Sequence, residues 1–394
     1  MKRAKKRFSR QLHLEALEGR LLLSASTNHK GLLQTGLTAL FSTARAHAMV
    51  SHANVTQQPV IPNLTATPTL TVSTIPANGD LNPYGVAFVP DQFPSGGRIH
   101  ADDILVSNFN NSGNVQGTGT TIIDVSPSGK QSLFFQGPTG LGLTTALGVL
   151  KRGFVIVGSV PTTDGTGATA QQGSLTILDK NGLQVATFSN AAILDGPWDL
   201  TIHDEGSRAQ VFVANVLSGA VERLDLSVPA HGNDIVVESA VQIASGYTHR
   251  TDPAALLLGP TGLAYDAKTD TLFVASTADN EVFAIHHAGT TKQDQGTGTV
   301  FINDTTHLHG PLGLALAPNG DLLVANGDAV NADPAQPSEI VEYTSKGKFV
   351  AQISLDTNPD AAFGIAISSD DGQLRFAAVE DDTNSLDVWT ISKH

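Results

Sequence analysis

The stretch GPLGLALAPNGDLLVAN (residues 310–326) contains two short apolar runs separated by the turn-forming residues Pro-Asn-Gly-Asp. The same pattern recurs as GPTGLAYDAKTDTLFVAS (259–276) and GPWDLTIHDEGSRAQVFVAN (196–215). Looser copies lie at 82–108 and 361–379, and one more copy ends in GFVIVGS (153–159). Six copies spaced by roughly 50 residues predict the blades of a β-propeller, because a four-stranded blade occupies a repeat of about that length.

Each repeat predicts four strands, which we call A to D from the axis outward. Strand A is the run of GLALA type, strand B is a nearly continuous apolar run such as LLVA, and strand C follows as EIVEYTS or EVFAIHH. Several copies then show a Ser-Gly or Asn-Gly turn that leads into strand D. The start of the second repeat stays open, because both Gly140 and Gly148 fit its first strand.

The sixth repeat ends after strand C at Ile391, so its outer strand is missing. The apolar segment Leu70–Ile75 precedes the first repeat and has no other partner. We expect it to pair with Leu386–Ile391, because closure of the ring removes exposed sheet edges. The predicted fold class is therefore all-β, a six-bladed β-propeller over residues 69–394 that is closed by an N-terminal strand.

Composition agrees with many short strands and limits the partners. The 394 residues include 38 Gly and 19 Pro but no Cys, and no apolar run approaches the length of about 18 residues that spans a bilayer. The net charge is −14 although the first ten residues, MKRAKKRFSR, are strongly basic. An acidic body repels phosphate backbones, so we do not expect nucleic acid as a partner. We expect a monomer.

The N-terminal region predicts export. Residues 14–25, LEALEGRLLLSA, resemble the LEPR-x-LL type leader of bacterial exported and surface proteins, with Gly19 where that pattern has proline. Ala46-His47-Ala48 offers a small-x-small cleavage site, so residues 1–48 are assigned to an export leader. Residues 49–68 are rich in Thr, Pro, Asn and Gln and predict a disordered linker. We expect a periplasmic, cell-surface or extracellular protein.

The repeat phrases of residues 259–285 and 310–326 resemble those of NHL-repeat propellers and, more distantly, those of gluconolactonase-like propellers. The resemblance covers residues 82–391 and implies a blade rather than a reaction. In gluconolactonase-like propellers an axial metal, held by Glu, Asn and Asp side chains, activates water. Here no Glu precedes the first strand A, which begins Asn82-Pro83-Tyr84-Gly85.

Strand order predicts which side of the ring binds. The B–C and D–A loops share one face, and the long loops gather there, at 109–119, 159–172, 245–259 and 327–337. Insertions on one face of a repeat protein usually mark its binding side.

Six polar residues are candidates for that face. Asn108, Asn215 and Asn326 end strand B in three repeats, where amide oxygens joined by a carboxylate can hold Ca²⁺ or another divalent cation. Asp328 and Glu380 follow strand B and offer carboxylates, and His309 offers a metal ligand or a base. The alternatives are loop-capping amides, solvated acids and a hydrogen-bonded surface histidine.

These patterns predict an exported NHL-like propeller that serves as a binding or interaction module for a protein, carbohydrate or small-molecule ligand. We favour this non-enzymatic role because no G-x-S-x-G, HExxH, P-loop or CxxC motif is present. The alternative function is a lactonase-like, metal-dependent hydrolase with an axial divalent cation.

Overall fold

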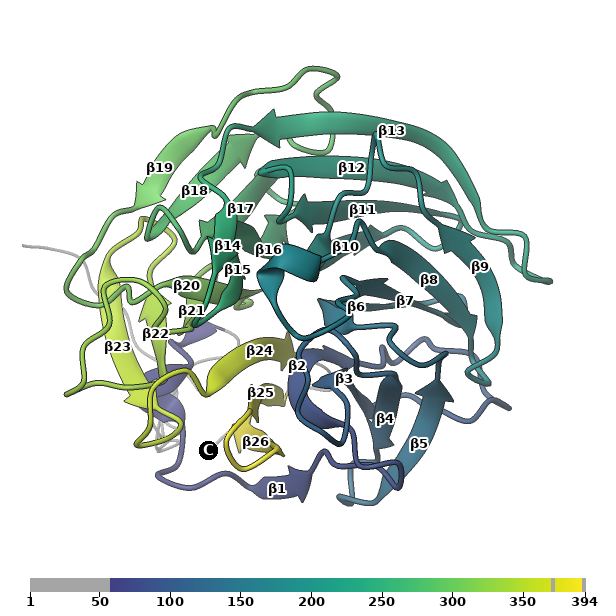
Figure 1. The fold of residues 1–394 in the computed structure, drawn as a ribbon, viewed down its shortest axis with the longest axis horizontal. Helices are drawn as coiled ribbons and strands as arrows, with labels where there is room; N and C mark the ends of the chain where they lie inside the picture. Colours follow the sequence, from purple (N-terminus) through teal and green to yellow (C-terminus); the bar gives the residue numbers. More distant parts are fainter. Residues whose placement is uncertain (1–56, 370–372, 392–394) are drawn as a thin grey trace, which may run out of the picture. The chain divides into compact units, whose positions relative to one another are not determined.

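The computed structural model describes residues 57–369 and 373–391, which contain six four-stranded antiparallel sheets arranged as a ring (Figure 1). In five sheets the strand order follows the chain from the axis outward, as in β2-β3-β4-β5 of the first blade, and in the sixth the outermost strand is β1. In Figure 1 the inner strands β2, β6, β10, β16, β20 and β24 surround the centre. The predicted fold class, an all-β propeller of six blades, is confirmed.

Each blade consists of four strands. The first three contain β2 (Leu81–Phe88), β3 (Ile104–Asn110), β4 (Thr121–Val125) and β5 (Gln131–Gln136); β6 (Leu143–Leu150), β7 (Phe154–Ser159), β8 (Ser174–Asp179) and β9 (Gln184–Phe188); and β10 (Pro197–Asp204), β11 (Arg208–Asn215), β12 (Ala220–Ser227) and β13 (Val236–Ser245). The last three contain β16 (Pro260–Asp266), β17 (Thr271–Ser276), β18 (Glu281–His286) and β19 (Thr299–Ile302); β20 (Pro311–Leu316), β21 (Leu322–Asn326), β22 (Glu339–Tyr343) and β23 (Phe349–Ser354); and β24 (Ala362–Ser368), β25 (Leu374–Glu380), β26 (Ser385–Ile391) and β1 (Leu70–Ser73). Outside the blades lie the hairpin β14 (Arg250–Asp252) and β15 (Leu256–Leu258) and the short 3₁₀ turns η2 (Ile61–Asn63) and η3 (Gly167–Thr169).

The ring closes as the sequence predicts. β1 pairs antiparallel with β26, with Leu70 opposite Val388 and Val72 opposite Leu386. Thr74 is fully buried just after β1, and both its amide and its hydroxyl donate hydrogen bonds to the Asn384 carbonyl. The two ends of the propeller are therefore held in one sheet, and β26 is paired on both sides.

The recurring glycine of strand A allows neighbouring blades to approach closely at the axis. A Cβ on Gly262, Gly313 or Gly364 would lie 2.4, 2.5 or 2.1 Å from the carbonyl oxygen of Leu312, Phe363 or Tyr84 in the next blade. Real Cβ atoms do not approach backbone oxygen to such distances. Close contact between inner strands, and not turn formation, is thus the physical reason for glycine at this position.

Two blades replace this glycine. In the second blade Thr145 occupies the glycine position, because its side chain reaches the carbonyl of Trp198, just before Asp199, as a Cβ on Gly262 would reach the carbonyl just before Gly313. The repeat register therefore follows neither Gly140 nor Gly148. The Thr145 hydroxyl donates a hydrogen bond to the Trp198 carbonyl of the third blade, so this side chain links the two inner strands.

The described part of the predicted linker is packed against the propeller. Val60 and Ile61 are buried, and their amides donate hydrogen bonds of 2.7 Å to the two carboxylate oxygens of Glu342 in β22. The Trp389 indole donates to the Thr65 carbonyl. Residues 57–68 thus differ from the disordered linker expected there, whereas the predicted leader, residues 1–48, and residues 49–56 lie outside the described residues. No helix among the described residues is long and apolar enough to span a membrane.

Candidate functional site

The axis is filled on the face that carries the B–C and D–A loops, which we call the loop face. Tyr84 lies between Phe109 and Phe363, with ring centroids 4.5 and 4.4 Å away, and Trp198 packs edge-on against it. Leu257, from the β14–β15 hairpin in the long D–A loop, joins the same buried cluster. This apolar plug occupies the region where the sequence suggested an axial cation.

The three predicted asparagines end their B strands at equivalent places and bind the neighbouring loops. The Asn108 amide donates to the Thr74 carbonyl and the Asn215 amide to the Ile193 carbonyl. The Asn215 side-chain oxygen also accepts a hydrogen bond from the Asp195 amide. These contacts are those of loop-capping residues in separate blades, although Asn108 Oδ1, like Asn326 Oδ1, is buried without a hydrogen-bond donor among the described residues.

Around Asn326, by contrast, the fifth blade collects metal-ligating side chains. His309 precedes β20, Asp328 follows β21 and Glu339 begins β22, and ligand atoms of all three lie within 4.8 Å of one another. His309 Nδ1 lies 2.7 Å from Glu339 Oε1, and both side chains are almost completely buried. The structure therefore unites His309, Asp328 and Asn326 of the predicted set and adds Glu339. We call His309, Asn326, Asp328 and Glu339 the blade 5 cluster.

Two oxygens of this cluster are buried without a hydrogen-bond donor. Asp328 Oδ2 accepts hydrogen bonds from the amides of Ser338 and Asp360, but its Oδ1 has no partner among the described residues. The Asn326 amide nitrogen donates to the His307 carbonyl and, at 3.4 Å, to Glu339, and its Oδ1 is also unpartnered. A buried polar atom without a partner costs about 1–3 kcal/mol, and a cation bound between these two oxygens would satisfy both.

Electrostatics favours a cation at the same place. Burial raises the pKa of Glu339 and of Asp328, and the neighbouring His309 partly opposes the shift in each case. Two buried carboxylates, one imidazole and one amide oxygen fit a divalent cation. Imidazole is a ligand for zinc-like transition metals, whereas Ca²⁺ prefers oxygen alone, so this set matches Zn²⁺ or Mn²⁺ better than Ca²⁺.

Glu380 lies apart from the blade 5 cluster. It ends β25, and both its carboxylate oxygens accept a hydrogen bond from the Thr383 amide. Burial raises its pKa to about 7, and the nearby Asp356 and Asp382 add to the shift. Burial likewise raises the pKa of Asp360 and of Asp381 to about 7. This acidic region supplies no imidazole, and its members enter no metal-ligating group among the described residues.

The sequence did not mark Glu339 as a ligand, because a glutamate at the start of a strand does not by itself indicate metal binding. Glu281 occupies the same first position of strand C in the fourth blade, where it accepts a hydrogen bond from Asn303 instead. The informative feature would have been a glutamate at the start of strand C combined with a histidine just before strand A of the same repeat. Only the fifth repeat has both, at Glu339 and His309.

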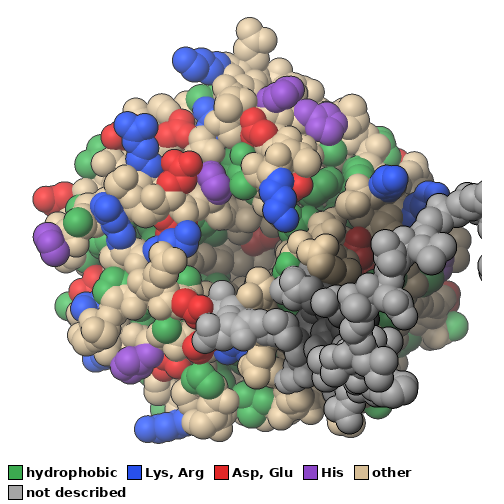
Figure 2. Space-filling model, turned by 180° about the vertical axis from the view of Figure 1, so that it is seen from behind, with side chains coloured by type: hydrophobic (Ala, Val, Ile, Leu, Met, Phe, Trp, Pro, Cys, Tyr) green, Lys and Arg blue, Asp and Glu red, His purple; other side chains and the backbone are tan. Residues whose placement is uncertain are grey.

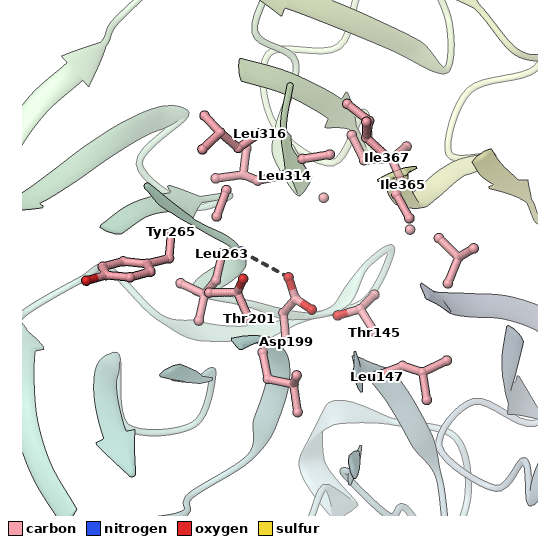
Figure 3. Close-up of a pocket in the computed structure, with 17 residues that line it drawn as sticks. Thr145, Leu147, Asp199, Thr201, Leu263, Tyr265, Leu314, Leu316, Ile365 and Ile367 are labelled. Carbon is pink, nitrogen blue, oxygen red and sulfur yellow. Dashed lines mark hydrogen bonds between the residues drawn. The ribbon is translucent and has the colours of Figure 1, made fainter. Parts of the chain in front are cut away.

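The opposite face, which carries the short turns, opens into the axis. A cavity of about 320 Å³ is lined by all six inner strands, and Asp199 is its single charged residue (Figure 3). Figure 2 looks at this turn face, which is hollowed near its centre. Asp199 takes the glycine position of the third blade, and its carboxylate accepts a hydrogen bond of 2.9 Å from the Leu263 amide. The sequence shows aspartate in place of glycine in the third repeat, but it does not show that this aspartate lines a cavity.

Comparison with known proteins shows the fold and no more. No family model and no curated protein matches the sequence. The allergen Mala s 1 of Malassezia sympodialis is similar with a TM-score of 0.50 and 13% identity over 82% of this chain and 95% of that one.

A protein described as a gluconolactonase gives a TM-score of 0.48 and 15% identity, over 84% and 96% of the two chains. The calcium-binding protein regucalcin from Agrobacterium tumefaciens gives 0.47 and 14%, over 82% and 97%. Identities this low show architecture alone. The six four-stranded sheets arranged as a ring make the chain a six-bladed β-propeller.

Proposed function

We propose that the protein is an exported binding module whose loop face is organised by one divalent cation in the blade 5 cluster. The observation that carries this proposal is the pair of buried, unpartnered oxygens, Asn326 Oδ1 and Asp328 Oδ1, beside the buried His309–Glu339 pair. A cation there satisfies the oxygens and offsets the charge of two buried carboxylates.

The cation would fix one of the long loops of the loop face, the loop between β21 and β22. Asp328 lies near its beginning, and Ser338 and Glu339 lie at its end, so the ligands hold both ends of the loop. Asp328 also accepts a hydrogen bond from Asp360, which extends the contact to the sixth blade. Two loops that present ligand-binding surface would thus be fixed by one ion.

The direct test is cation binding by wild type and two matched glutamine variants. Glu339→Gln removes one charge from the cluster, whereas Glu342→Gln removes an equally buried charge three residues away, outside the cluster. After dialysis against chelator, calorimetric titration with Zn²⁺, Mn²⁺ and Ca²⁺ should give about one site in wild type and in Glu342→Gln. Glu339→Gln should bind at least about tenfold more weakly. Equal binding by all three proteins, or none by wild type, would contradict the proposal.

The same variants test the hydrolase alternative. An activated water needs an accessible position on the metal, yet His309 and Glu339 are 2% and 0% exposed. We therefore expect metal-loaded wild type not to hydrolyse δ-gluconolactone above the rate of the metal in buffer. Turnover that disappears in Glu339→Gln would replace the binding module by an enzyme.

Export rests on the leader sequence at residues 1–48. The expected outcome is a mature protein that starts near residue 49 and is recovered outside the cytoplasm. N-terminal sequencing of the protein from its native host measures this directly, and an intact Met1 in the cytoplasmic fraction would contradict it.

A further inference from the structure

The inner strands enclose a cavity on the turn face, separate from the loop face. Its wall comes from β2, β6, β10, β16, β20 and β24, and most of its side chains are aliphatic, such as Leu147, Leu314 and Ile365 (Figure 3). Each of these strands is the end member of its sheet, so part of its main-chain N–H and C=O groups stays free on the axial side. The cavity thus combines an aliphatic wall with main-chain hydrogen-bonding groups.

Asp199 is the exception in this wall. Four of the other five blades carry glycine at the same ring position, and the fifth carries Thr145, whose hydroxyl is neutral. The spatial requirement at the blade junction is therefore met without a charge. The carboxylate of Asp199 accepts a hydrogen bond from the Leu263 amide, but none of the residues that line the cavity is Lys, Arg or His.

A half-buried carboxylate with no cationic partner in the cavity wall is costly. Burial raises the pKa of Asp199 to about 7, and the amides of Leu263 and Leu200 only partly oppose the shift. A structural role alone would be served by threonine, as in the second blade, without this cost. A cationic ligand would remove the cost, because it supplies the missing opposite charge.

We propose that the turn-face cavity binds a small alkylammonium ion, with the ammonium group on Asp199 and the hydrocarbon part against the aliphatic wall. A volume of about 320 Å³ lies at the lower end of the range for small-molecule sites. A single carboxylate with no second acid in the cavity gives a divalent cation too few ligands, whereas an ammonium group needs one carboxylate and main-chain carbonyls.

The test uses n-hexylammonium chloride as the probe, with 1-hexanol and hexanoate as neutral and anionic probes of the same chain length. Calorimetric titration at pH 8 should show one saturable hexylammonium site in wild type and markedly weaker binding of the other two compounds. Asp199→Asn keeps the shape and the acceptor for the Leu263 amide, and we expect it to bind at least about tenfold more weakly. Asp199→Gly, which introduces the residue of the other blades, should bind equally weakly.

Asp204→Asn is the matched control, because Asp204 lies on the same strand but outside the cavity, where it accepts a hydrogen bond from the Lys151 amide. It should bind like wild type. Lowering the pH from 8 to 6 protonates Asp199 and should weaken binding roughly tenfold. The only other titratable residue that lines the cavity is Tyr265, and burial raises its pKa further above its usual value, so it stays neutral over this range.

Binding of hexylammonium to Asp199→Asn at wild-type strength would overturn the proposal. So would equal binding of 1-hexanol, or no saturable binding to wild type. The blade 5 cluster takes no part in any of these measurements, so this result and that of the cation titration are independent.

Discussion

Replacement of Gly364 by alanine tests why the repeat carries glycine next to the axis. The φ angle of Gly364 is not in the left-handed region, so alanine can adopt its backbone conformation and only steric contact opposes it. The new Cβ would lie 2.1 Å from the Tyr84 carbonyl oxygen, which requires β24 and β2 to separate by roughly 1 Å. Tyr84 stacks between Phe109 and Phe363, so the separation would also loosen the axial plug.

We expect Gly364→Ala to destabilise the protein by about 3 kcal/mol, the upper end for overpacking in a rigid core. For a domain of this size the corresponding decrease of the melting temperature is about 6 °C. Thermal unfolding followed by calorimetry measures it. Gly113→Ala is the control, because its Cβ would lie 3.2 Å from the Asn111 side-chain oxygen and 3.9 Å from Val115 Cγ2, with no backbone atom as close. Melting temperatures that agree within about 1 °C for the two variants would refute close strand contact as the reason for glycine.

Three further predictions concern closure, pH and the N-terminal segment. Deletion of residues 69–76 removes β1 and exposes the edge of β26, so the melting temperature should fall by at least about 10 °C; an unchanged value would contradict closure. Burial raises the pKa of Asp124, Asp360 and Asp381 to about 7, so the folded state keeps protons that the unfolded state loses above pH 4. The stability that these protons contribute is fully present below pH 4 and is lost as the pH rises through 7. Calorimetry should therefore give a lower melting temperature at pH 8 than at pH 5. A higher melting temperature at pH 8 would refute the shifts. Glu342→Ala leaves the Val60 and Ile61 amides unpaired and should cost about 2 kcal/mol in urea unfolding, whereas an unchanged midpoint would show that the segment adds no stability.

The architecture was predictable because its determinants are local in sequence. Alternating turn residues and apolar runs repeat six times, and each repeat needs only its neighbours to bury its faces. Closure was predictable by counting strands, because the sixth repeat has only three and the apolar segment Leu70–Ile75 has no partner in the first repeat. The register of the second blade did not follow, because Thr145 meets the same steric requirement as glycine with a hydroxyl bonded to Trp198.

The sites were predictable only in part. His309, Asn326 and Asp328 could be placed on the loop face from strand order, and the structure brings them together. Their common partner Glu339 lies 30 residues after His309, at the start of β22, so no pattern within a few residues of it indicates the pairing. Asn108, Asn215 and Glu380 share the expected face but are held by loop contacts in other blades.

The sequence by itself determined the number of blades, their strand order and the strand that closes the ring, because periodic burial is encoded residue by residue. Only the tertiary structure decided that the loop face is closed by Tyr84 and its aromatic neighbours and that Asp199 lies alone in an open cavity. Both facts depend on how six inner strands converge at the axis. Distances across that axis arise from the packing of whole blades, and no single repeat contains them.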